Sequence, residues 1–202
     1  MAAMIARKTV HDSFTLERTL KAPPARVFHA FADDKAKMKW FDGGPEWQEL
    51  AREFDFREGG RERAKGLHTA HNVVSDFQCF YHEIAPNQRI IYSYKMWLND
   101  VPISVSLATI EFAPAGAGTK LTMTEHGVFL DDFDDNGGRK EGTNEKTGFG
   151  LLVEDTTSIG AVQYPQRDQG HTRMKLIIKE RAEAGSHTPI MRYAPRVARC
   201  RR

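Results

Sequence analysis

Alternation of apolar and polar residues predicts the first strand of this chain. Between Ser13 and Ala22, Leu16 and Leu20 occupy even-numbered positions, and the odd-numbered positions between them hold threonine and glutamate. A period of two places the leucines on one face of a strand and the polar residues on the other face, toward water. One buried and one solvated face is typical of an antiparallel sheet.

A change of period after this strand predicts a short helix. Pro23 and Pro24 suit the entry of a helix, where the first N–H groups have no intrahelical partner. Over residues 25–32 the apolar side chains recur at helical spacing, at Val27, Phe28, Phe31 and Ala32. The segment that follows, KWFDGGPEW, is expected to be a loop that carries Trp40 and Phe41.

Further strands follow, joined by turns rich in glycine. The segment RIIYSYKMWL is rich in β-branched and aromatic residues, as strands are. One of its faces carries Ile90, Tyr92, Tyr94, Met96 and Leu98, and the other carries Ile91 and Trp97. Both faces are partly apolar, so alternation alone does not decide which one points inward. In the last strand, Leu121, Met123 and Glu125 share a face. The sequences FREGGR and APAGAG are predicted to be hairpin turns.

Four segments in order resemble one known family. They are residues 14–41, 54–61, 83–94 and 110–127, among them FDFREGGR and IEFAPAGAGTKLTMTEHG. These segments resemble the homologues of the activator of the heat-shock-chaperone ATPase (AHSA-type), in the START-like, helix-grip superfamily (SRPBCC). The resemblance implies an α+β fold in which a curved antiparallel sheet grips a long C-terminal helix around an apolar cavity. It implies no reaction, because this fold hosts many functions.

The resemblance sets the expected domain boundaries. Residues 1–12 are an N-terminal extension, residues 13–143 form the START-like domain, and residues 144–202 depart from the family. There Gly148, Gly150 and Gly160 are poor helix residues, and Pro165 blocks a continuing helix. Two explanations stay open: a frame change near Asn144, or a genuine variant with an atypical or displaced C-terminal helix. Periodicity predicts a helix over residues 172–184, before a basic, disordered end.

Composition favours a packed, cytoplasmic protein. The 202 residues are 40% hydrophobic and 28% charged, and no apolar run approaches the roughly 18 residues of a membrane span. We see no signal peptide, and the two cysteines, Cys79 and Cys200, exclude a disulfide framework. Residues 1–143 carry a net charge of −3 and residues 144–202 a net charge of +5. We therefore expect no nucleic-acid binding by the domain.

Glu125 is the main candidate for chemistry. If its strand face lines the cavity, apolar surroundings would raise its pKa and suit it to acid–base work. Alternatively, Glu125 lies near the rim, solvated or paired with an arginine. Tyr81, Tyr92 and Tyr94 could offer hydroxyl groups to a ligand carbonyl, or could be core residues with satisfied hydroxyls.

Together these expectations describe a ligand site without a metal or an organic cofactor. Its expected lining is Trp40, Phe41, Tyr81, Tyr92, Tyr94, Met96, Met123 and Glu125. The two histidines of HTAH, His68 and His71, form too weak a pattern for zinc.

Three functions are compatible with this pattern. The first is a binding protein for a small apolar or amphipathic ligand, without an assigned reaction. The second is an enzyme resembling polyketide cyclases or dehydratases, with Glu125 or Tyr94 as acid or base. The third is a chaperone-partner module, which the family name suggests and which we rank last. A homodimer is possible on any of the three.

Overall fold

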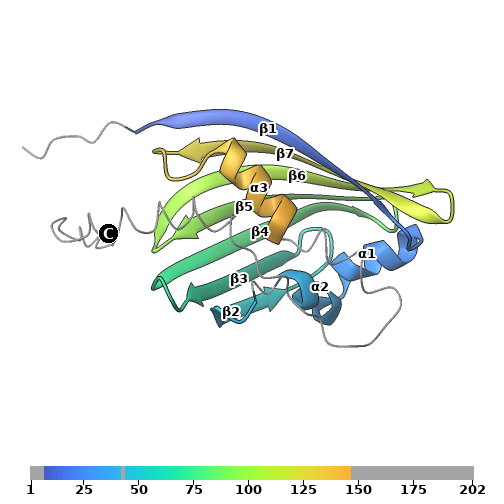
Figure 1. The fold of residues 1–202 in the computed structure, drawn as a ribbon, viewed down its shortest axis with the longest axis horizontal. Coiled ribbons are helices and arrows are strands. Elements are labelled where there is room, and N and C mark those ends of the chain that lie inside the picture. The colour runs from blue at the N-terminus through green and yellow to red at the C-terminus, as the bar shows by residue number, and fades with distance from the viewer. Residues whose placement is uncertain (1–6, 42–43, 147–202) are drawn as a thin grey trace, which may run out of the picture.

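A computed structural model describes residues 7–41 and 44–146 of the chain. Seven antiparallel strands form one curved sheet in the order β1-β7-β6-β5-β4-β3-β2 (Figure 1). The strands are β1 (Thr9–Leu20), β2 (Trp47–Phe54), β3 (Arg61–His68), β4 (Val73–Ala85), β5 (Arg89–Leu98), β6 (Val101–Ala115) and β7 (Gly118–Leu130). The helices are α1 (Pro24–Ala32), α2 (Asp34–Phe41) and α3 (Asn136–Lys146). The α+β fold with a curved antiparallel sheet is therefore confirmed.

The helices lie on one face of the sheet, which we call the concave face (Figure 1). α1 and α2 lie near one end of it, and α3 crosses the strands at the β1–β7–β6 side. The main core cluster joins Val27 and Phe31 of α1 to sheet residues such as Ile110, Leu121 and Met123. Within the described residues, no helix has the length and apolar character needed to cross a membrane. The helix predicted over residues 172–184 and the basic end lie outside the described residues.

The first strand and helix follow the sequence pattern closely. β1 begins at Thr9, four residues before the predicted start at Ser13, and Leu16 and Leu20 are buried as expected. α1 begins at Pro24, one residue before the predicted start, with Pro23 in extended conformation just before it. Since an extended backbone is what the residue before a proline favours, the Pro-Pro pair fixes where the helix starts.

The Trp-Phe segment is a helix, and the prediction of a loop was wrong there. Trp40 and Phe41 end α2, which Asp33 caps by accepting a hydrogen bond from the Ala36 N–H at 2.8 Å. The Trp40 indole donates to the Ala30 carbonyl oxygen at 2.9 Å, and its ring packs edge-on against Phe31. These contacts fasten the second helix to the first.

The acidic segment of residues 131–138, DDFDDNGG, is only partly a loop. Asp135 caps α3 by accepting a hydrogen bond from the Gly138 N–H at 2.8 Å, so the second half of the segment starts a helix. Asp134 pairs with Arg139 and is mostly buried. Because the chain is helical from Asn136 onward, Arg139 lies over the sheet.

Strand register decides which face of β5 points inward. Tyr94 lies opposite Cys79 of β4, and Tyr92 lies opposite Tyr81. Cys79, Tyr81 and Tyr94 are all buried, so the even-numbered side chains of β5 belong to the concave face. Trp97 lies on the other, convex face, where Lys95 packs over its ring. Both predicted hairpin turns are present, with Gly59 and Gly116 at positive φ.

Candidate functional site

Inward-facing residues form two rows across the concave face, and each row crosses five strands. The first row runs Glu62, Cys79, Tyr94, Ser106 and Gly127 from β3 to β7. The second row runs Tyr81, Tyr92, Ala108, Glu125 and Phe14 from β4 to β1. Each row therefore places a buried carboxylate among apolar and tyrosine side chains. The partners of these two carboxylates define two polar clusters.

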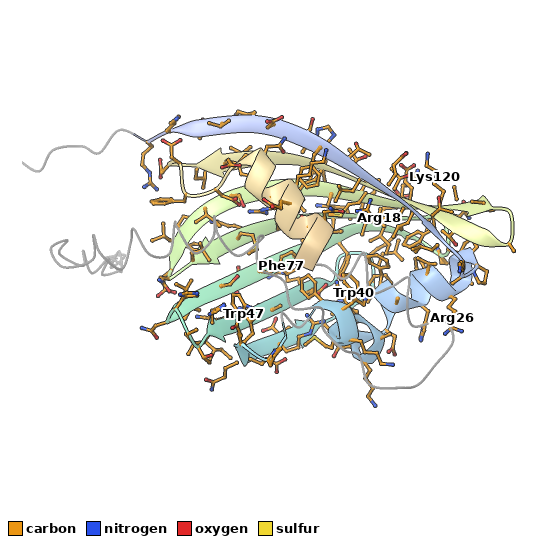
Figure 2. All side chains as sticks on the ribbon, in the orientation of Figure 1. Arg18, Arg26, Trp40, Trp47, Phe77 and Lys120 are labelled. Carbon is orange, nitrogen blue, oxygen red and sulfur yellow. The ribbon has the colours of Figure 1, made fainter. Side chains whose placement is uncertain are left out.

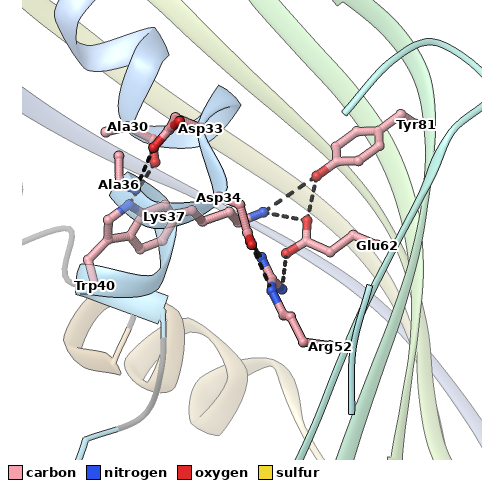
Figure 3. Close-up of polar contacts among 9 residues, drawn as sticks. All are labelled: Ala30, Asp33, Asp34, Ala36, Lys37, Trp40, Arg52, Glu62 and Tyr81. Carbon is pink, nitrogen blue, oxygen red and sulfur yellow. Dashed lines mark hydrogen bonds and ion pairs between the residues drawn. The ribbon is translucent and has the colours of Figure 1, made fainter. Parts of the chain in front are cut away.

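The first cluster, which we call the Glu62 cluster, joins α2 to the β2–β3 edge (Figure 3). Glu62 is fully buried, and its carboxylate accepts hydrogen bonds from Lys37 Nζ at 2.5 Å and Arg52 Nη1 at 2.8 Å. The Tyr81 hydroxyl also donates to Glu62. Arg52 in turn donates to Asp34 at 2.6 Å. Two cations and two carboxylates thus neutralise one another beneath the second helix.

Burial and charge act in opposite directions on Glu62. Burial alone would raise its pKa, but its cationic and hydrogen-bonding neighbours, Lys37 foremost, outweigh burial and hold the pKa below its ordinary value of 4.5. Burial, and then the charge of Glu62, raise the pKa of Tyr81 far above its usual range. Glu62 is therefore a carboxylate at neutral pH, and Tyr81 keeps the proton that it donates.

The second cluster, which we call the Glu125 cluster, lies beneath α3. The Tyr94 hydroxyl donates to Glu125 Oε1 at 2.6 Å, and Arg139 Nη1 donates to the Tyr94 oxygen at 2.6 Å. Arg139 Nη1 lies 3.7 Å from Glu125 Oε1. Arg139 Nη2 donates to Ser104 at 2.6 Å and to Asp134. A single arginine from the helix thus holds both the carboxylate and the phenol of the sheet.

Protonation in the Glu125 cluster is fixed by burial and charge. Burial raises the pKa of Tyr94 above its ordinary value, and the opposing effect of Arg139 does not cancel it. Burial lowers the pKa of Arg139, but Tyr94 and the nearby carboxylates raise it by more. Tyr94 is therefore a neutral phenol that donates, and Arg139 stays positively charged.

One oxygen of Glu125 has no hydrogen-bond partner in the part of the chain that the structure describes. The residue is 1% exposed, and within residues 7–41 and 44–146 its Oε2 atom accepts no hydrogen bond. Buried polar atoms are nearly always hydrogen-bonded, so an unpaired carboxylate oxygen needs an explanation. In the Glu62 cluster both carboxylate oxygens accept hydrogen bonds, so the Glu125 cluster is the one that leaves a carboxylate oxygen without a donor among the described residues.

Aromatic side chains separate the two clusters. Phe41 and Phe77 pack edge-on with ring centroids 5.5 Å apart, and the ring centroids of Phe77 and Tyr94 are 5.1 Å apart. Figure 2 places Phe77 and Trp40 between α3 and α2 on the concave face. Phe41, Phe77, Tyr92 and Met96 are only half-buried at the margin of the core. We call these four residues the aromatic strip.

The structure places the predicted lining residues unevenly. Tyr92, Met96 and Phe41 belong to the aromatic strip, whereas Trp40, Tyr81 and Met123 are buried in the core. Tyr94 and Glu125 are joined directly. A solvated Glu125 at the rim, one of our alternatives, is wrong because α3 covers it; the arginine pairing in the same alternative is present. All eight predicted residues nevertheless belong to the concave side.

Six charged residues of the clusters were missed from sequence, among them Asp34 and Asp134, the partners of Arg52 and Arg139. Lys37, Arg52 and Arg139 look like ordinary surface cations in the text of the chain, and Glu62 looks like part of a polar strand. Alternation along the strands could have identified two of them, because Arg52 and Glu62 each occupy a position that faces the concave side. A charged residue at an inward position predicts a buried partner.

Comparisons with known proteins agree with the fold. A family model described as "Activator of Hsp90 ATPase homolog 1-like protein" matches residues 21–148. A solved protein from Rhizobium leguminosarum is 42% identical with a TM-score of 0.68, over 74% of this chain and 96% of that chain. A solved protein from Rhizobium loti is 40% identical with a TM-score of 0.62, over 67% of this chain and 92% of that chain.

A more distant neighbour shows the fold alone. The AHSA1-like protein from Aeromonas hydrophila is 15% identical with a TM-score of 0.53, and the match covers 76% of this chain and 100% of that chain. A search of the curated proteins finds no match. On the family model and the two rhizobial structures together, this chain belongs to the Activator of Hsp90 ATPase homolog 1-like family.

Proposed function

We propose that the concave face binds a small amphipathic molecule, and that the protein acts as a ligand-binding protein without a reaction of its own. The observation that carries this proposal is the aromatic strip, which is half-buried between two buried polar clusters. Ligand sites are typically apolar surfaces with a few convergent polar groups. The START-like fold of the family supports the same function.

The spacing of the strands sets the size of the ligand. Tyr81 of the Glu62 cluster and Glu125 lie three strands apart in one row, which corresponds to about 14 Å at ~4.8 Å per strand. A molecule of that length would place its apolar body on the aromatic strip and its polar end at a cluster. Burying roughly 250 Å² of apolar surface contributes about 6 kcal/mol. That value corresponds to a Kd in the tens of micromolar, before ordering costs.

A second candidate function is acid–base catalysis of the cyclase or dehydratase type. The specific observation in its favour is that buried ionisable groups converge on the concave face, as they do in active sites. Tyr94 would donate a proton and Glu125 would accept one. However, Tyr94 already donates to Glu125 and accepts from Arg139, so the pair is occupied. We therefore rank binding first.

Native mass spectrometry of freshly purified protein tests the binding proposal. We expect a co-purifying molecule that disappears on denaturation and is lost in Tyr92→Ala, because Tyr92 lies in the aromatic strip. Phe80→Ala is the matched control, since Phe80 is an aromatic residue exposed on the convex face. Tyr94 is unsuitable as a probe because its removal also breaks the contacts to Glu125 and Arg139.

Two outcomes would decide against the proposal. One is a wild-type protein that carries no ligand and binds no environment-sensitive dye. The other is dye binding that survives Tyr92→Ala and is lost in Phe80→Ala. A bound molecule that changes mass on incubation with the wild type, but not with Glu125→Gln, would favour the catalytic candidate.

A further inference from the structure

We propose that Glu125 recognises a hydrogen-bond donor of the ligand, a hydroxyl or an ammonium group, through its Oε2 atom. This inference rests on the proposed function and specifies the polar end of the ligand. It assigns the contact with the polar end of the ligand to the Glu125 cluster rather than to the Glu62 cluster. In the Glu62 cluster both carboxylate oxygens already accept hydrogen bonds.

The first argument is the cost of the unpaired oxygen. Glu125 Oε1 already accepts the Tyr94 hydroxyl and lies near Arg139, while Oε2 is buried without a donor in the described part of the chain. A buried acceptor left unpaired costs about 1–3 kcal/mol, and more when it is charged. A ligand donor would remove this cost on binding.

The second argument is that the cluster disfavours an anionic head group. Both terminal nitrogens of Arg139 already donate, to Tyr94, Ser104 and Asp134. The Tyr94 proton is committed to Glu125. A carboxylate or phosphate head group offers no donor to Oε2 and would bring like charge beside a carboxylate, whereas a hydroxyl or ammonium group offers the donor that Oε2 lacks.

The third argument is the position of Tyr92. Tyr92 and Glu125 lie in the same row with only Ala108 between them, and the alanine methyl group is the smallest side chain in that row. Within the described residues, no hydrogen bond involves the Tyr92 hydroxyl. Burial raises its pKa well above the ordinary value, so it stays protonated. A ligand hydroxyl could donate to Glu125 and accept from Tyr92.

A series of probes with one chain length and different head groups tests this inference. The probes are octan-1-ol, octylamine, methyl octyl ether and octanoate, titrated into the full chain at neutral pH by displacement of a bound dye. We expect the alcohol and the amine to bind at least about 10-fold more tightly than the ether, about 1.4 kcal/mol. Octanoate should bind most weakly. The alcohol–amine comparison distinguishes a neutral donor from a cationic one.

Variants then locate the preference. Glu125→Gln presents an amide N–H as well as an oxygen, so the preference for the alcohol over the ether should fall below about 3-fold. Glu111→Gln is the matched control, because Glu111 is exposed on the opposite face of β6 and should leave the preference unchanged.

The possible outcomes distinguish this inference from the proposed function. Equal binding of the alcohol and the ether by the wild type overturns this inference and leaves the proposed function standing. A preference that persists in a folded Glu125→Gln variant overturns it too. If no probe binds, the proposed function fails and this inference falls with it. The wild-type comparison needs no variant, so it decides even where Glu125→Gln does not fold.

Discussion

Replacing Glu62 by glutamine should destabilise the protein strongly. The change keeps the shape of the side chain but removes the negative charge that faces Lys37 at 2.5 Å and Arg52 at 2.8 Å. The Glu62 side chain is fully buried, and the side chains of Lys37 and Arg52 are 10% and 11% exposed, so solvent screens these charges little. Removing one partner of a buried ion pair costs about 3–5 kcal/mol. Because glutamine keeps an acceptor oxygen, we expect about 3 kcal/mol.

Urea denaturation as a function of pH measures this effect. The pKa of Glu62 is lowered in the folded protein, so its stabilising contribution is complete above the unfolded value near 4.5 and is lost as the pH falls through the folded pKa. The difference between the wild type and Glu62→Gln should therefore be largest at neutral pH and shrink in acid. At neutral pH we also expect Tm to fall by roughly 6–12 °C.

Glu53→Gln is the matched control. Glu53 is an exposed glutamate on the neighbouring strand β2, so its replacement should change stability by no more than about 0.5 kcal/mol. A Glu62→Gln variant that is as stable as Glu53→Gln at neutral pH would refute the reasoning. So would a difference that grows as the pH falls below 4.5.

Three further predictions concern separate features. Gly118→Ala should lower the urea midpoint far more than Gly116→Ala, because a Cβ added at Gly118 would lie 2.0 Å from the carbonyl oxygen of Leu20 in β1. A Cβ added at Gly116 would meet no atom within 4 Å, although its φ of +60° strains any residue with a side chain. Equal losses would contradict this prediction. Tyr94→Phe should lower stability by about 1–3 kcal/mol in a thermal melt, since Arg139 and Glu125 lose their shared hydroxyl, and an unchanged melt would count against the Glu125 cluster. In a Cys200→Ser background, Cys79 should react with a thiol reagent only as fast as the protein unfolds, because burial raises its thiol pKa; rapid labelling without denaturant would show that the site opens.

Local pattern was sufficient for most of the fold. Period-two alternation predicted which side of β1 is buried and placed Leu121, Met123 and Glu125 of β7 on one face, and helical spacing with the Pro-Pro pair located α1. α2 was missed because Gly44 and Pro45, shortly after its end at Phe41, give the whole segment the composition of a loop. Turn residues show where a helix stops and say little about where it begins.

The site depended on contacts that local pattern does not contain. The shared face of Met123 and Glu125 followed from parity, but the arginine over Glu125 comes from α3, whose start lies in an acidic segment that resembles a loop. Tyr94 and Arg139 are 45 positions apart, and Lys37 and Glu62 are 25 apart. Only strand register and helix placement bring such residues together.

Ligand-induced shifts in the NMR spectrum of labelled protein test the central claim most directly. Methyl-labelled methionine and the tryptophan indole N–H groups report on both faces at once. On addition of octan-1-ol we expect shifts of Met96, Met123 and the Trp40 indole, which lie on the concave side, and no shift of the Trp97 indole on the convex side. Shifts confined to Trp97, or an unchanged spectrum, would contradict a binding site on the concave face.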